Sequence, residues 1–243
     1  MLIFDEVSLV EQIIKEKQKP VRMSVQNLIR YIARYYYDDC KDMNSKEYAR
    51  YVLDIIKKID IPATDYQEYQ YAKFTISYCK NLLSGLFPHT LRQVREIYIT
   101  QKEMDIIDSA AYRKERKVIF TLYVIAKAFS HETGWVNASE ADIFALANVN
   151  VSNDEKMEIM HALYKDGLIQ VNHIIDKSGY QVQLFPKSDN ILKVTELKNF
   201  GNQYVVFKGK GIKMCKKCGK IYKIKNPYER HSKYCPKCRN LLS

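Results

Sequence analysis

The sequence predicts a mostly α-helical protein in three parts, residues 1–98, 99–186 and 187–243. Three observations lead to this fold class. Apolar residues recur at helical spacing in the first hundred residues, three further helical patterns and a strand pair follow, and two Cys-x-x-Cys pairs lie near the C-terminus. A chain of 243 residues is long enough for two or three small domains, each with its own core.

The first part is predicted to be a helical domain. Segments 24–39 and 45–60 each place their apolar side chains on one helical face, and segment 65–83 is expected to form a third helix. Ser8 and Glu11 have the spacing of a capping box, which indicates a helix that starts at Ser8.

Tyrosine is unusually frequent in this helical domain. Tyrosine rings stack on the bases of single-stranded nucleic acids, which would make this part a binding platform. Tyrosines at helical spacing also fill the edge of a core while their hydroxyl groups stay in water. Because the charge of this half is balanced, we favour the second interpretation for the clustered residues, which are Tyr35, Tyr36, Tyr37, Tyr66, Tyr69 and Tyr71.

The middle part has a recognisable order of elements. Pairs with N-cap spacing, Thr100 with Glu103 among them, indicate helix starts. Helices are expected at 113–129, 138–149 and 152–167, and strands at 168–175 and 180–185 around a turn at 176–179. Three helices followed by a β-hairpin resemble a winged helix-turn-helix domain over about residues 99–185.

A winged helix does not by itself imply DNA binding. A helix in the major groove usually offers Arg, Lys, Asn or Gln to the base edges. The outer face of the third helix instead presents Asp154, Met157, Glu158, His161 and Lys165, and the turn of the hairpin adds only Lys177. The basic run 112–117 opens the first helix, where it is also explained by solvation. Protein contact and weak DNA contact therefore both remain open for this domain.

The third part contains two expected short strands, over residues 190–200 and 202–214, and the glycines among them suggest a flexible approach to the cysteines. Cys215, Cys218, Cys235 and Cys238 follow with a spacing typical of a structural zinc site. Four sulfur ligands suit Zn²⁺ and leave no coordination position for a reacting water. A redox dithiol and an iron–sulfur centre are the alternatives, and His231 is an alternative ligand for one cysteine. The sequence shows no export signal, so we prefer metal binding over disulfides. With so few apolar residues, this segment should not fold without its metal.

The excess of positive over negative charge arises in this same segment. Residues 208–243 contain twelve Lys or Arg and one acid, which accounts for the net charge of +11. A solvated basic tail would explain the pattern, and contact with nucleic-acid phosphates would explain it as well. The excess of Lys over Arg favours backbone contact, and Tyr222, Tyr228 and Tyr234 could stack on bases. The candidate nucleic-acid-binding residues are Lys216, Lys217, Lys220, Lys223, Lys225, Arg230, Lys233, Lys237 and Arg239.

Three stretches of the sequence carry a family resemblance, "YITQKEMDIID", "WVNASEADIFALANVNVS" and "CKKCGK … SKYCPKC". They resemble small proteins of phages and other mobile elements of Gram-positive bacteria, which pair a winged-helix segment with a C-terminal zinc motif. The resemblance covers about residues 97–239 and implies a fold, but no reaction.

We therefore expect a non-enzymatic, cytoplasmic nucleic-acid-binding protein, a regulator or replication accessory of a mobile element. No nucleotide-binding, hydrolase or metalloprotease motif is present, and the five histidines are scattered. An inhibitor or adaptor that acts on a host or defence ribonucleoprotein complex is the alternative, and an enzyme whose site assembles only in the fold is a third. The longest apolar run, residues 118–126, is too short to cross a membrane.

Overall fold

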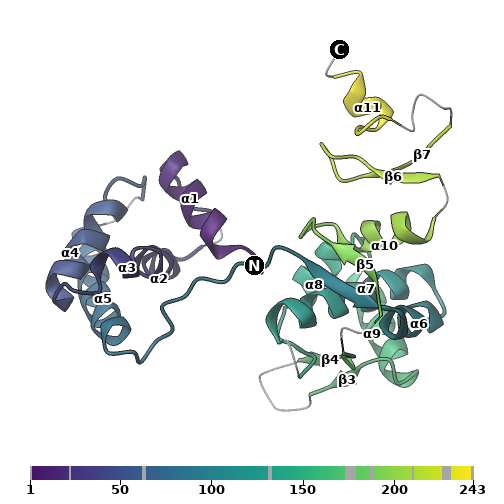
Figure 1. Cartoon of the computed structure of the whole chain (residues 1–243), viewed down its shortest axis with the longest axis horizontal. Helices are drawn as coiled ribbons and strands as arrows, with labels where there is room; N and C mark the ends of the chain where they lie inside the picture. The colour runs from purple at the N-terminus through teal and green to yellow at the C-terminus, as the bar shows by residue number, and fades with distance from the viewer. Residues whose placement is uncertain are drawn as a thin grey trace. The chain divides into compact units, whose positions relative to one another are not determined.

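In a computed structural model, the chain forms two compact units, Ile3–Val94 and Arg95–Ser243, and each is described by itself. The structure describes residues 2–21, 23–61, 64–130, 133–172, 179–186, 189–209, 211–225 and 231–241, without the side chain of Tyr66. Helices predominate in both units, accompanied by small antiparallel sheets in the second (Figure 1). The predicted mostly α-helical fold class is confirmed.

The first unit is a bundle of helices around one apolar core. Its elements are α1 (Glu6–Glu16), α2 (Val25–Tyr35), α3 (Tyr37–Cys40), α4 (Ser45–Ile56) and α5 (Asp65–Leu83). The helix predicted over residues 65–83 is confirmed at both ends. Thr64 and Gln67 form a capping box at its start. The predicted start of α1 at Ser8 is wrong, because the Asp5 carboxylate caps this helix and accepts a hydrogen bond of 2.9 Å from the Ser8 N–H.

The tyrosines of the first unit lie mainly at the edge of its core. Tyr35, Tyr36, Tyr37 and Tyr71 are partly buried against the core residues, and Tyr36 also contacts Tyr51 edge to face. Tyr69 is instead exposed, with 64% of its surface accessible. The free thiols of Cys40 and Cys79 are fully buried in the same core. These contacts agree with the core-edge interpretation for the four partly buried rings.

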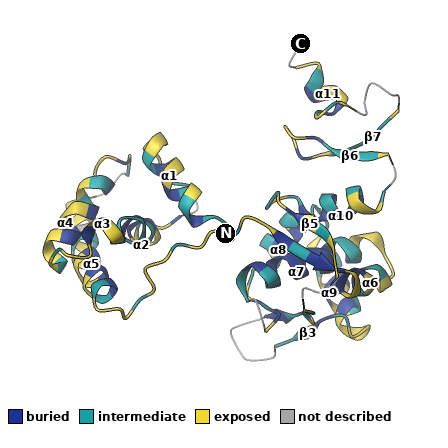
Figure 2. Cartoon of the chain, viewed as in Figure 1, coloured by how far each residue is buried: buried dark blue, intermediate teal, exposed yellow. Residues whose placement is uncertain are grey.

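The second unit is built around one long buried helix, α7 (Arg113–Phe129). Every residue from 118 to 126 is buried, so the longest apolar run of the sequence forms the centre of this unit (Figure 2). Around α7 lie α6 (Gln101–Ser109), α8 (Glu140–Leu146), α9 (Asn153–Lys165) and α10 (Phe200–Lys208). The outer face of α9 is exposed at the five positions expected from the sequence, Asp154, Met157, Glu158, His161 and Lys165.

Three short strands accompany the helices α7, α8 and α9, one between α7 and α8 and two after α9. They are β2 (Trp135–Val136), β3 (Gln170–Val171) and β4 (Tyr180–Gln181), which form an antiparallel sheet in the order β2-β4-β3. The pairing of β3 with β4 was expected, whereas β2 was not, because two residues are too few to show a period. The expected turn at 176–179 falls largely outside the described residues.

Residues after Pro186 pack against elements that precede them in the chain. β5 (Asn190–Val194) pairs antiparallel with β1 (Ile97–Thr100), so that Val194 lies opposite Ile97. The strand predicted over residues 202–214 is wrong in its first half, which belongs to α10. Its β-branched Val205 and Val206 indicated a strand. A helix instead brings Phe200 and Tyr204, four residues apart, to the same buried face, where the Tyr204 ring contacts Phe120 of α7.

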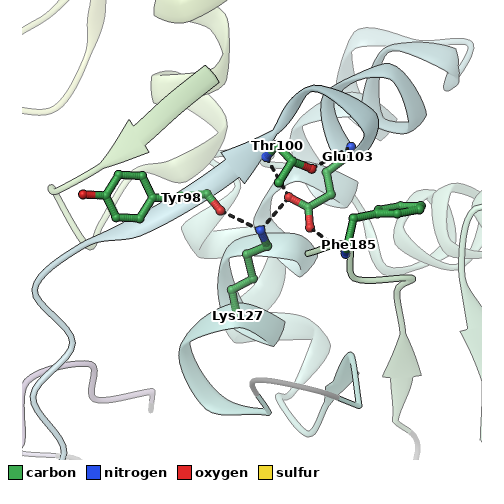
Figure 3. Close-up of polar contacts among 5 residues, drawn as sticks. All are labelled: Tyr98, Thr100, Glu103, Lys127 and Phe185. Atoms are coloured by element: carbon green, nitrogen blue, oxygen red, sulfur yellow. Dashed lines mark hydrogen bonds and ion pairs between the residues drawn. The ribbon is translucent and has the colours of Figure 1, made fainter. Parts of the chain in front are cut away.

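A buried ion pair joins α6 and α7 (Figure 3). The Lys127 ammonium lies 2.6 Å from the fully buried Glu103 carboxylate and also donates to the Tyr98 carbonyl, again at 2.6 Å. The same carboxylate accepts backbone hydrogen bonds from Thr100 (2.9 Å) and Phe185 (3.2 Å). Glu103 was expected only as part of a capping box, and it also connects the start of α6 to the segment that follows β4.

Replacing Lys127 with Met should destabilise the second unit by about 3–5 kcal/mol, because the buried Glu103 charge would lose its counter-ion. Trp135 is the only tryptophan of the chain and lies in this unit, so urea denaturation followed by its fluorescence measures the effect. Lys114→Met is the matched control on the same helix. It removes an exposed ion pair with Glu155 and should cost at most about 1 kcal/mol. Equal losses in the two variants would contradict the assigned role of Glu103.

Candidate metal centre

The four cysteines of the C-terminal segment converge on one point. Their sulfur atoms all lie within 4.8 Å of one another, and the Cys218 and Cys235 sulfurs are 3.8 Å apart. A tetrahedral ion with metal–sulfur bonds of about 2.3 Å would separate its ligands by about 3.8 Å, whereas a disulfide needs about 2.05 Å. The cysteines are therefore free thiols in a geometry that can hold a metal ion.

Backbone hydrogen bonds shape the two turns that carry the sulfurs. The strands β6 (Ile212–Met214) and β7 (Ile221–Lys223) form a hairpin, and Cys215 follows the first of them. The Gly219 N–H donates to the Cys215 carbonyl at 2.8 Å, which closes the first turn. Cys235 is the N-cap of α11 (Pro236–Arg239), and the Arg239 N–H donates to its carbonyl at 2.9 Å. Lys216 and Lys233 connect the two turns through a backbone hydrogen bond of 3.0 Å.

The environment of the sulfurs favours the thiolate of Cys215 and opposes that of Cys238. Burial alone would raise the pKa of the Cys215 thiol, but hydrogen bonds from the backbone N–H groups of Cys235, Cys218 and Lys217 lower it to about 6. Burial and the neighbouring sulfurs raise the pKa of Cys238 to about 12. Four thiolates at this distance need a cation among them, which is the chemistry of a metal ligand set.

Two aromatic rings complete the small core of this module. Tyr222 and Tyr234 pack against the buried cysteines, and the Tyr222 hydroxyl donates to the Ser232 carbonyl at 2.8 Å. Both rings thus have a structural role in addition to the base stacking suggested by the sequence, and Tyr228 lies outside the described residues. His231 is exposed and is not part of the cysteine cluster. The alternative in which His231 replaces a cysteine is not supported by this geometry.

The metal module is attached to α10 through the turn at Gly219. The Asn202 side chain of α10 donates to the Gly219 carbonyl at 3.0 Å, and this hydrogen bond is buried. Asn199, the residue before α10, lies against the same glycine and accepts a hydrogen bond of 2.8 Å from Asn148. The Lys117 ammonium of α7 donates to the Asn148 carbonyl at 2.6 Å. A chain of polar contacts therefore connects α7 to the residue that follows Cys218.

The basic run at the start of α7 is explained by these internal contacts. Lys114 pairs with Glu155, and the Arg116 Nε donates to the Ala110 carbonyl at 2.7 Å. Burial, with a smaller effect of Arg113, lowers the pKa of Lys117 to about 8. Spacing alone could not indicate that Lys117 is half-buried. The run contributes to the packing of the second unit.

The predicted nucleic-acid-binding residues lie around the cysteine cluster. Arg239 is half-buried, and Arg230 lies outside the described residues. Within the described part of the chain, six of these lysines form no ion pair with a carboxylate, namely Lys216, Lys217, Lys220, Lys223, Lys233 and Lys237. Lys208 differs, because it pairs with Asp108 of α6. The side chains of these six lysines and of Lys225 are all exposed.

Comparison of the chain with protein-family models, curated proteins and solved structures gives no match. Among the described residues, none of the helices combines the length and the apolar character that a membrane crossing requires. The cysteine cluster is also the only group of three or more His, Cys, Asp or Glu side chains in the described residues whose ligand atoms converge.

We expect the purified protein to contain one metal ion per chain, measured by elemental analysis. Cys215→Ala/Cys238→Ala should contain none, because two of four ligands are lost. Cys40→Ala/Cys79→Ala is the matched control and should keep the full equivalent, since these thiols lie in the core of the first unit. Metal-free wild-type protein, or four alkylatable thiols in the native metal-loaded state, would rule out this centre.

Gly219→Ala should accelerate metal loss. Gly219 has a φ of +67°, and an added Cβ would lie 2.4 Å from the Asn199 Nδ2, whose side chain is held by Asn148. Gly211→Ala is the matched control, with a φ of +71° but no atom within 4 Å of the added Cβ. Transfer of the metal to a chromogenic chelator should be about tenfold faster for Gly219→Ala than for Gly211→Ala, as expected for about 1.4 kcal/mol of additional strain. Equal rates would show that the contact with Asn199 is unimportant.

Proposed function

We propose that the C-terminal module is a structural zinc site that presents lysines to the phosphates of a nucleic acid, and that the protein acts without catalysing a reaction. The observation that carries this proposal is the set of six exposed lysines around the cysteine cluster, none of which is paired with a carboxylate in the described residues. Unpaired cations on a small rigid module are available to an anionic partner.

Zinc is supported by the donor set. Four cysteine sulfurs in a closed tetrahedral arrangement are typical of structural zinc, and no position remains for a substrate or a reacting water. Zinc binding contributes about 10–16 kcal/mol in finger peptides at neutral pH, which is sufficient to fold a module whose core consists of cysteines and two tyrosines. The metal thus has a structural role, and the lysines are the binding groups.

The charge distribution favours phosphate contact without strong sequence preference. A zinc ion with four thiolates carries a net charge of −2, which the six lysines outweigh. Lysine binds phosphate as a point charge, whereas bidentate recognition of guanine usually requires arginine. This chemistry suits DNA and RNA alike, since both offer the same phosphate group.

We further propose that α7, α8 and α9 with the sheet β2-β4-β3 form a winged helix-turn-helix domain. The order of three helices and a three-stranded antiparallel sheet supports this assignment. Its α9 presents Asp154 and Glu158 together with Met157, which is 58% exposed. Acids repel phosphates, whereas an exposed methionine between charges suits a protein partner. A regulator or replication accessory of a mobile element would combine these two surfaces, and an adaptor of a ribonucleoprotein complex would use the same pair.

Replacement of Lys216, Lys217, Lys220 and Lys223 with the uncharged Gln should weaken nucleic-acid binding and flatten its salt dependence. For duplex DNA each lost phosphate contact reduces the slope of log K against log salt by about 0.9, so four contacts reduce it by about 3–4. Fluorescence anisotropy with a labelled duplex at several salt concentrations measures both effects.

The matched control replaces four exposed lysines of the first unit, Lys46, Lys58, Lys73 and Lys80, with Gln, which gives the same change in net charge. This variant should keep the wild-type slope. Metal content should be unchanged in both variants, because no ligand is altered. A slope that the two quadruple variants share would assign the binding to net charge, and an unchanged slope in the first variant would refute the proposed surface.

A further inference from the structure

The first unit contains a cleft of about 410 Å³ that is lined by both aromatic and basic side chains. Arg30 and Arg34 come from α2, Phe74 and Tyr78 from α5, and Phe87 from the segment after α5. Small-molecule sites typically have volumes of about 300–1,000 Å³ and combine apolar walls with a few polar groups. The size and composition of this cleft are those of a ligand site.

One wall of the cleft is built from stacked aromatic rings. The Phe74 and Tyr78 rings are 6.0 Å apart and nearly parallel, with 13° between their planes. The Tyr78 and Phe87 rings are 5.3 Å apart at 25°. A planar aromatic ligand can extend such a stack at one of its end rings, Phe74 or Phe87.

The cleft also carries positive charge, and the guanidinium of Arg34 is fixed in position. The Arg34 guanidinium lies 3.1 Å from the Glu6 carboxylate and donates to the Thr90 carbonyl, so its orientation is set before any ligand binds. Its Nε is buried and has no hydrogen-bond partner among the described residues. Glu6 also lies 4.0 Å from Arg92, so two guanidiniums share this one carboxylate. Arg30 adds an exposed guanidinium 5.5 Å from the centre of the Phe74 ring.

The remaining polar groups at the cleft are donors and acceptors of modest strength. The Ser77 hydroxyl and the Asn81 amide both line it. Burial raises the pKa of Tyr78 and outweighs the lowering effect of Arg34 and Arg30, so its hydroxyl remains protonated. Such groups can recognise the edge of a heterocyclic ring, while the guanidiniums bind an anionic group.

We propose that this cleft binds a nucleotide unit, with the base against Phe74 and the phosphate between Arg30 and Arg34. The shared chemistry is a planar base that carries a phosphate, which is supplied either by a free nucleotide or by one residue of a nucleic-acid strand. This site lies in the first unit and does not depend on the zinc module or on its lysines.

Calorimetric titration of the full-length protein with AMP and with a ten-residue adenine oligonucleotide tests the proposal and separates the two sources. Adenosine and ribose 5-phosphate are the ligand controls, and each should bind at least tenfold more weakly than AMP because it lacks one of the two recognised groups. Arg30→Gln should weaken binding about tenfold and Phe74→Leu at least fivefold. Both altered side chains are partly or fully exposed, so the fold should be retained.

Arg50→Gln is the matched control, since Arg50 is an exposed helical arginine of the same unit that does not line the cleft. All oligonucleotide titrations are made in the background of the Gln variant of Lys216, Lys217, Lys220 and Lys223, which reduces the contribution of the module. Binding of AMP or of the oligonucleotide that Arg30→Gln and Phe74→Leu weaken and Arg50→Gln leaves unchanged supports the site. No binding of either probe at millimolar concentration, or binding that the cleft variants leave unchanged, overturns it.

Discussion

Four sulfur atoms within 4.8 Å of one another are the constraint on which the C-terminal module depends. Thiolates at this distance repel each other, so the arrangement is stable only with a cation among them. The hairpin of β6 and β7 and the short helix α11 contribute few apolar contacts of their own. The shape of the module, and with it the position of the lysines on its surface, would therefore follow from the coordination of a single ion by these four sulfurs.

The module does not end at its ligands. Gly219, which follows Cys218, receives the Asn202 amide of α10 and lies against Asn199. Within α10, Gly201 packs so closely that a Cβ there would lie 1.9 Å from the Ala147 carbonyl oxygen. The helix that supports the metal turn is thus pressed directly onto the end of α8. The geometry of the metal site is consequently linked to the packed centre of the second unit and not only to the flexible approach that its glycines suggest.

Much of the fold and the cysteine centre could be predicted from the sequence. Helical periodicity identified α5 and α7, the spacing of Thr100 and Glu103 marked the start of α6, and the cysteine spacing indicated the cluster. Long-range contacts were harder to predict. The pairing of β1 with β5 joins segments about a hundred residues apart. The valines of α10 suggested a strand, but the burial of this segment against α7 as a helix outweighs that preference.

The candidate sites show the same division. Local spacing revealed the metal ligands and the lysines, because all of them lie within 25 residues. The cleft of the first unit combines Arg30 and Arg34 with Phe74 and Phe87, which come from distant segments, so no local pattern could indicate it. Lys127 gave no signal as a counter-ion for Glu103 for the same reason. Groups that meet only through tertiary packing require the structure.

The chain contains two chemically different kinds of cysteine. Cys40 and Cys79 are sealed in an apolar core, and burial, followed by the effect of Cys40, raises the pKa of Cys79 to about 12. Cys218 is exposed at the surface of the metal module. Oxidants should therefore attack the module first, release its metal and unfold the lysine surface while the helical first unit stays intact. The two surfaces that we propose for binding would then differ in redox sensitivity, because oxidation would disrupt the lysine surface of the module and leave the cleft of the first unit intact.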